Sequence, residues 1–217
     1  MFEVGVIPDV GVGCPAGSDE IVIRMDDEDD GNVSSRSGFV GKTNVGETSS
    51  ATRFDFCKVD GTVFKPFSTS ATAADQRDDY AVLKLGTTCP AGSQEFSRHF
   101  DNEDDGNRNF FTGVINPNVS NQDTTLFFCL FRFAESGVAT MSAFPNLGSG
   151  FRYGVFGPSD FNRGALATGT IRTDDEDSGN TSTYIVPSDA LSSAVRIIQP
   201  DPTVSHGATI LRVVRAR

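Results

Sequence analysis

The sequence predicts an all-β protein, and three observations support this class. Apolar and polar residues alternate with the period of a β-strand in stretches such as Thr52–Val59 and Gln94–Phe100. The 22 glycines and 10 prolines supply turn signals such as "NPNVSN" and "VDGT" at short intervals. No segment keeps an apolar i, i+3, i+4, i+7 pattern over the length of a helix. We therefore expect short antiparallel strands joined by tight turns.

An internal repeat divides the chain into three predicted units. The acidic stretches "RMDDEDDGN", "HFDNEDDGN" and "RTDDEDSGN" are near copies, and their first acids, Asp26, Asp101 and Asp174, lie 75 and 73 residues apart. The motif "CPAGS" precedes the first two stretches but not the third. We expect a single domain over 1–217, composed of repeats over 1–78, 79–151 and 152–217, of which the third is degenerate.

Each unit is predicted to contain about four strands. The opening strands share an alternating pattern and begin at Phe2, Tyr80 and Tyr153, and the closing strands begin at Thr52, Thr124 and Ala208. In the second unit, the strands are expected near Tyr80–Leu85, Gln94–Phe100, Phe110–Ile115 and Thr124–Phe133. Since closure removes exposed strand edges, we expect a closed pseudo-threefold β-prism or a trefoil-like barrel. The alternative is a series of small β-sandwich modules in tandem.

The four cysteines follow the repeat and predict one disulfide in each of the first two units. The expected pairs are Cys14 with Cys57 and Cys89 with Cys129, and their separations are 43 and 40 residues. The third unit has Val213 in place of the second cysteine and has no "CPAGS" motif, so both partners are missing together. Four free thiols in a reducing compartment are the alternative. Disulfides favour an extracellular or periplasmic location.

The acidic stretches place oxygen-bearing side chains at alternate positions, followed by Gly and Asn. This pattern resembles the first half of the EF-hand calcium loop, in which positions one, three and five face one ion and Gly at position six permits a sharp turn. The resemblance implies a calcium site in each loop. The ligands it implies are Asp26, Glu28, Asp30 and Asn32 in the first loop, Asp101, Glu103, Asp105 and Asn107 in the second, and Asp174, Glu176 and Asn180 in the third.

The third loop has Ser178 at position five, so its site should be the weakest. The loops also depart from the EF-hand pattern, because position twelve is Ser37, Thr112 and Ile185 rather than Glu, and no flanking helix is expected. Backbone carbonyls or distant carboxylates would have to complete the coordination.

Two alternatives to a metal site remain open. Arg24, His99 and Arg172 each stand two residues before the first acid and could form internal salt bridges. A plain solvated acidic turn is the other. The triplets that begin at Asn32, Asn118 and Asn180 match the N-glycosylation acceptor pattern, although turn or ligand roles are favoured at Asn32 and Asn180.

Charge and composition exclude several classes of function. The formal net charge of −11 repels nucleic acid and anionic lipid. No apolar run approaches the ~20 residues that cross a bilayer, and the first residues lack the features of a signal peptide, so we expect a soluble chain without membrane insertion. Only two histidines are present, His99 and His206, and neither lies in a hydrolase motif. We do not expect an enzyme, because three copies of one acidic loop indicate binding positions rather than one asymmetric active site.

The sequence thus predicts a secreted, calcium-dependent binding module that recognises carbohydrate or a cell-surface partner. The absence of Trp weakens the lectin interpretation, since sugar platforms favour rings with a polar edge. The alternative is an extracellular structural protein that self-assembles into a filament or coat. In that case the terminal strands would pair with a neighbouring copy, giving a homo-oligomer.

Overall fold

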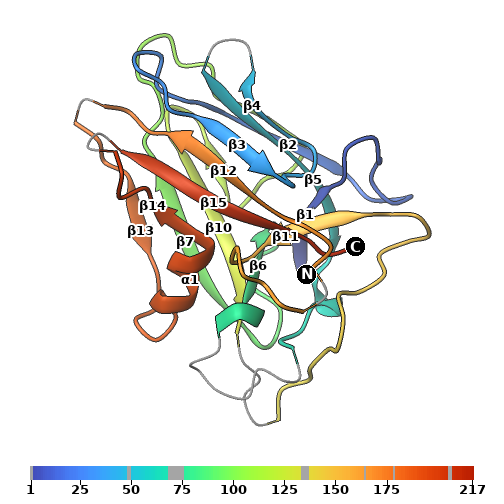
Figure 1. Cartoon of the computed structure of the whole chain (residues 1–217). Coiled ribbons are helices and arrows are strands. Elements are labelled where there is room, and N and C mark those ends of the chain that lie inside the picture. The colour runs from blue at the N-terminus through green and yellow to red at the C-terminus, as the bar shows by residue number, and fades with distance from the viewer. Residues whose placement is uncertain are drawn as a thin grey trace.

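A computed structural model describes residues 2–47, 50–67, 76–132, 137–163, 165–177, 179–204 and 207–217. Over these ranges the chain is all-β, with one α-helix, α1 (Leu191–Ile197), and two 3-10 turns, η1 (Gly61–Val63) and η2 (Gln76–Asp78) (Figure 1). The strands are β1 (Glu3–Pro8), β2 (Glu20–Asp26), β3 (Ser35–Gly38), β4 (Thr43–Glu47), β5 (Ala51–Asp60), β6 (Tyr80–Lys84), β7 (Ser93–Phe100), β8 (Phe110–Thr112), β9 (Val119–Ser120), β10 (Thr124–Phe131), β11 (Tyr153–Phe156), β12 (Thr168–Asp174), β13 (Thr183–Ile185), β14 (Ile198–Pro200) and β15 (Ala208–Arg215).

The all-β class is confirmed. The opening strands are β1, β6 and β11, and the closing strands are β5, β10 and β15. The strand expected over Phe110–Ile115 ends at Thr112, because Gly113 has a φ of +79°, outside the extended region. The strand β9 and the helix α1 were not expected. Phe133 and most of the polar stretch between Phe67 and Asp79 lie outside the described residues.

Within each predicted unit, the opening strand pairs antiparallel with the closing strand, as in β1–β5, β6–β10 and β11–β15. The closing strand also pairs with the second strand, as in β5–β2, β10–β7 and β15–β12. The three opening strands are bridged to one another, in the pairs β1–β6, β1–β11 and β6–β11. The units are therefore joined to each other through their opening strands.

The third strand of each unit pairs outside its own unit. The strand β8 pairs with β2, β13 pairs with β7, and β3 pairs with β12. Each of these short strands therefore lies beside the second strand of another predicted unit.

Together these pairings form one branched 15-stranded sheet, which is not closed into a ring. The prediction of a closed prism or trefoil-like barrel is therefore not confirmed. The terminal strands β1 and β15 lie on either side of β11, and the two chain ends are close together in Figure 1. A salt bridge of 2.6 Å between Arg215 and Asp9 links the same two regions.

Two hydrophobic clusters form the core. The larger contains residues from the inward face of every long strand, among them Ile23, Phe54 and Phe128, and the smaller surrounds Tyr80 and Tyr153. Full burial of a large apolar side chain contributes about 1.5–3 kcal/mol, so the many buried phenylalanines account for a core without Trp.

The predicted disulfides are confirmed. Cys14 is bonded to Cys57 and Cys89 to Cys129. Such bonds persist in oxidising compartments, which is typical of a protein outside the reducing cytoplasm. Among the helices of the described ranges, none has the length and apolar character to cross a membrane.

Candidate metal site at the acidic loops

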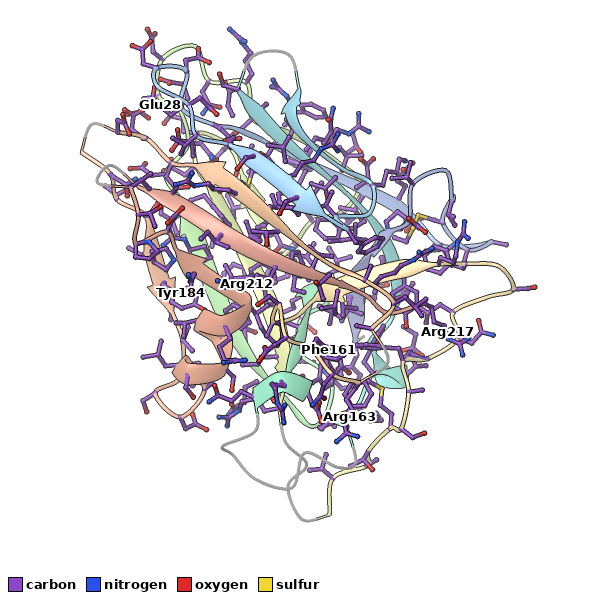
Figure 2. The ribbon with its side chains drawn as sticks, in the orientation of Figure 1. Glu28, Phe161, Arg163, Tyr184, Arg212 and Arg217 are labelled. Carbon is purple, nitrogen blue, oxygen red and sulfur yellow. A yellow bond between two sulfur atoms is a disulfide. The ribbon has the colours of Figure 1, made fainter. Side chains whose placement is uncertain are left out.

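The three acidic loops meet at one end of the sheet, where the blue, green and orange segments converge in Figure 1. One glutamate from each loop points into this convergence. The carboxylate oxygens of Glu28, Glu103 and Glu176 lie within 4.8 Å of one another, and each residue is only 6–7% exposed. Glu28 is labelled at this end in Figure 2. The sequence interpretation grouped the acids of one loop around one ion, whereas the structure brings together position three of all three loops.

Backbone N–H groups of neighbouring loops hold the glutamates in place. The N–H of Asp177 donates to Glu28 Oε2 at 3.0 Å, and the N–H of Asp29 donates to Glu103 Oε2 at 3.1 Å. In the same order, the N–H of Asp104 donates to Glu176 Oε2 at 3.3 Å. Each loop therefore fixes a carboxylate that belongs to another loop.

Each of the first two glutamates also accepts a hydrogen bond from its own loop. The N–H of Asp30 donates to Glu28 Oε1, and the N–H of Asp105 donates to Glu103 Oε1, both at 2.9 Å. These bonds restrict the carboxylate rotamers without using all the oxygen lone pairs. The carboxylates are thus positioned before any ligand arrives.

The first acids of the loops do not join this group. Asp26 Oδ2 accepts the backbone N–H of Arg108 at 2.7 Å, and Asp174 Oδ2 accepts that of Val33 at 2.8 Å. Asp101 accepts the N–H of Thr181 in the same way. These side chains join one loop to the next rather than facing an ion.

The loop asparagines close their own turns. The Nδ2 groups donate to the carbonyl oxygen of the glutamate four residues earlier, and the Oδ1 atoms accept the N–H two residues later. Because both ends of each amide are used, these side chains serve as turn residues. The residues concerned are Asn32, Asn107 and Asn180.

The glutamates open into a pocket of about 570 Å³. Among the described residues, every lining side chain is a carboxylate, and the lining residues are Glu28, Asp29, Asp30, Glu103, Asp105, Glu176 and Asp177. Asp30 and Asp105 are therefore brought near the glutamates as predicted, whereas Asp29 and Asp177 were not singled out in the sequence. Ser178 lies outside the described residues.

The electrostatics of the group reflect burial and crowding. Burial raises the pKa of Glu103, and the neighbouring Glu28 carboxylate raises it further, while the N–H groups of Asp105 and Asp29 lower it. Burial likewise raises the pKa of Asp174 to about 6. A cation among the glutamate oxygens would favour the charged form of Glu103 and so lower its pKa, whereas Asp174 binds the backbone of another loop and lies outside this group.

A second layer of polar side chains lies at position two of each loop, and the sequence interpretation missed it. Asp27, Asn102 and Asp175 are completely buried. Hydroxyl groups of Ser34 and Thr52 donate to Asp27 Oδ2, each at 2.7 Å. Strand alternation could have indicated this burial. Position two of a loop lies two residues after an inward-facing residue of the preceding strand, such as Met25 or Phe100, and therefore points to the same side.

Of the internal salt bridges proposed as an alternative, the one between Arg24 and Asp26 is seen among the described residues. Arg24 Nη2 lies 3.7 Å from Asp26 Oδ1. Arg172 instead pairs with Asp201 at 2.6 Å, and His99 Nε2 lies 3.6 Å from Asp123. His206 lies outside the described residues.

Comparisons with known proteins give one finding. A family model described as bacterial ApeC matches residues 1–141. No curated protein and no solved structure matches the chain.

Proposed function

The chain belongs to the bacterial ApeC family, and we propose that it is a calcium-dependent binding module whose ion is held by the three acidic loops. The observation that carries the proposal is the convergence of Glu28, Glu103 and Glu176 within 4.8 Å. The family name supplies no activity, so the proposal depends on the geometry of the loops.

The dimensions and donor type of the group suit calcium. Calcium takes six to eight oxygen ligands at about 2.3–2.6 Å, so oxygens on opposite sides of the ion are about 5 Å apart. Three carboxylates within 4.8 Å of one another match this span. All the donors are oxygens, which favours a hard cation over zinc or copper. Asp30 and Asp105 line the same pocket and are exposed enough to add further ligands.

An ion bound by the glutamates would keep some coordination positions facing the pocket, where an external ligand could occupy them. Hydroxyl groups of a carbohydrate are suitable oxygen ligands, so we propose carbohydrate or a cell-surface partner as the target, outside the cytoplasm. The sequence interpretation implied three calcium sites, one in each loop, whereas we propose one site that the three loops share. A binding role, rather than catalysis, is proposed.

We also propose a pseudo-threefold arrangement of the units. Its support is the cyclic order of the inter-loop hydrogen bonds, from the first loop to the second, the second to the third, and the third to the first. The exchanged third strands follow a cyclic order as well. The self-assembling alternative gains less support, because β1 and β15 are both paired inside the chain, next to β11.

Isothermal titration calorimetry in resin-treated, metal-free buffer tests the proposal. We expect one calcium ion per chain, with magnesium much weaker because it demands a tighter octahedral shell. Glu103→Gln should weaken calcium binding at least tenfold. Asp104→Asn is the matched control, since it removes a charge from the same loop at an exposed side chain outside the pocket lining.

A glycan array with and without calcium then tests the partner. No calcium heat, or three equal sites, would contradict the shared site. Calcium binding without any calcium-dependent glycan signal would contradict the carbohydrate target and leave a cell-surface protein as the partner to examine.

A further inference from the structure

A second pocket, of about 770 Å³, lies far from the acidic loops. It is formed where the segment around Phe144–Arg152 and the residues Asn162, Arg163 and Leu166 meet Ala216 and Arg217. Figure 2 shows the separation, with Glu28 at the upper left and Arg163 and Arg217 at the lower right. The lining residues of this pocket and those of the proposed cation site are different.

The charge of the pocket is opposite to that of the protein. Among the described residues, its lining includes Arg152, Arg163 and Arg217 and no acidic side chain, although the whole chain carries a net charge of −11. A guanidinium presents paired N–H donors in a plane that matches a carboxylate. Three such groups around one pocket therefore favour an anionic ligand.

One of the arginines is held by its Nε atom, and a second lies near a carboxylate. Arg163 Nε lies 2.5 Å from Asp78 Oδ2, and Arg152 Nε lies 3.5 Å from Asp9 Oδ2. Among the described residues, the terminal nitrogens of both side chains have no partner. Arg217 forms no side-chain ion pair with any residue of the described ranges. The fold thus anchors the guanidinium of Arg163 while its outer donors remain available.

Buried aromatic rings support one apolar side of the pocket. Phe144 and Phe151 contribute to the lining and are 4% and 6% exposed. Phe151 stacks on Tyr153, with ring centroids 5.6 Å apart, and Phe144 stacks on Phe161 at the same distance. Because each ring stacks on a second ring, its position in the lining is fixed by packing. Leu166, which is 65% exposed, adds apolar surface to the lining, and an apolar side suits the C–H groups of a sugar ring better than a bare inorganic anion.

We propose that this pocket binds a carboxylate-bearing sugar. The arginines would contact the carboxylate, the apolar side at Leu166 would contact the ring, and the amides of Asn146 and Asn162 would contact hydroxyl groups. The volume accommodates one or two sugar rings, within the usual range of about 300–1,000 Å³ for ligand pockets. The inference is independent of the cation site, so either proposal can fail while the other stands.

Nuclear magnetic resonance titration of the ¹⁵N-labelled chain, in metal-free buffer, tests the proposal. The probes are D-glucuronate, the uncharged D-glucose and inorganic phosphate. We expect glucuronate to shift the amide signals of Gly148, Gly150 and Ala216 with a millimolar Kd, and glucose and phosphate to bind at least tenfold more weakly. Equal binding of glucose would overturn the arginine contribution, and equal binding of phosphate would overturn the sugar assignment.

Substitutions locate the binding to the pocket. Arg152→Gln with Arg217→Gln should weaken glucuronate binding at least tenfold, whereas Arg36→Gln, an exposed arginine outside the pocket lining, should change it less than twofold. Arg163 is left intact because its partner Asp78 is buried. Thermal melts of all variants should match the unmodified chain. Unchanged glucuronate binding in the folded double variant would refute the site.

Discussion

Arg98 of β7 forms a buried salt bridge with Asp175 of the third acidic loop, with 2.9 Å between Nη2 and Oδ2. The two side chains are 4% and 0% exposed, and Thr209 Oγ1 accepts further hydrogen bonds from the same guanidinium. The pair joins the second predicted unit to the third. It was not foreseen from the sequence, which pointed to Arg24, His99 and Arg172 instead.

Removal of one partner should destabilise the fold strongly. Arg98→Leu leaves the Asp175 carboxylate buried without its cation, and such losses cost about 3–5 kcal/mol. The free energy of unfolding from urea titration measures the effect. Arg98→Leu with Asp175→Leu should recover much of the loss, because no charge then remains unpaired. Arg196→Leu is the control, since its partner Asp160 is 52% exposed and such surface pairs contribute about 1 kcal/mol or less.

Calcium should raise the free energy of unfolding if it binds the shared site. At a free calcium concentration 100 times the Kd, the gain is about 2.7 kcal/mol, and a variant with a tenfold weaker site keeps about 1.4 kcal/mol at the same concentration. We expect Glu28→Gln, Glu103→Gln and Glu176→Gln to lose similar amounts of this gain. A loss in one variant alone would show that the three glutamates do not share an ion. Urea unfolding with and without calcium provides the measurement.

The contact between β12 and β3 depends on a glycine. A Cβ atom added at Gly169 would lie 2.1 Å from the carbonyl oxygen of Phe39, so the backbone would have to move. Gly169→Ala should therefore destabilise the protein by about 1–3 kcal/mol in urea unfolding. Gly13→Ala is the matched control, because nothing lies within 4 Å of its added Cβ. Equal stability of the two variants would contradict the close approach of β3.

Asp79 should make stability depend on pH. Burial raises its pKa from 3.8 to about 6, against the lowering effects of Ser193 and Arg132. The folded state therefore binds this proton more tightly than the unfolded state, and the contribution of Asp79 to stability falls as pH rises from about 4 to about 6. Above pH 6 the contribution is constant, and the total change is about 3 kcal/mol or less.

The variant Asp79→Asn isolates this effect, because other acids titrate in the same range. The difference in unfolding free energy between Asp79→Asn and the unmodified chain should shift in favour of the variant by about 1–3 kcal/mol between pH 4 and pH 7. Asp160→Asn, at an exposed position, should show a much smaller shift. A flat difference for Asp79→Asn would show that the buried carboxyl is not the titrating group.

Much of the secondary structure could be predicted because it depends on local alternation. The closing strand β10 begins at Thr124 as expected, since apolar residues at every second position mark its buried face. Cysteines at equivalent positions predicted both disulfides. The exchange of β3, β8 and β13 between units could not be predicted, because it depends on pairing between residues far apart in the sequence.

The candidate site was only partly accessible for the same reason. Spacing within one loop identified Glu28 and Asp26 as candidate ligands, but it could not show that Glu28 meets Glu103 while Asp26 binds the backbone of Arg108. The burial of Asp27 could be inferred from strand alternation only after the end of β2 was known. The clustering of side chains from different loops depends on the tertiary structure. A repeat motif in the sequence does not show which side chains of the repeats will face one another.

The exchanged third strands also set a limit on how such a protein can change in length during evolution. Loss of the third unit would remove β13 from β7 and would leave β3 without β12. A gene that gained or lost one unit would thus encode at least one orphaned strand and one bare edge. Linear solenoids vary their copy number freely because each repeat contacts only its neighbours. Here the loss of a predicted unit would break strand pairs with the other two, whereas substitutions and loop changes would leave those pairs intact.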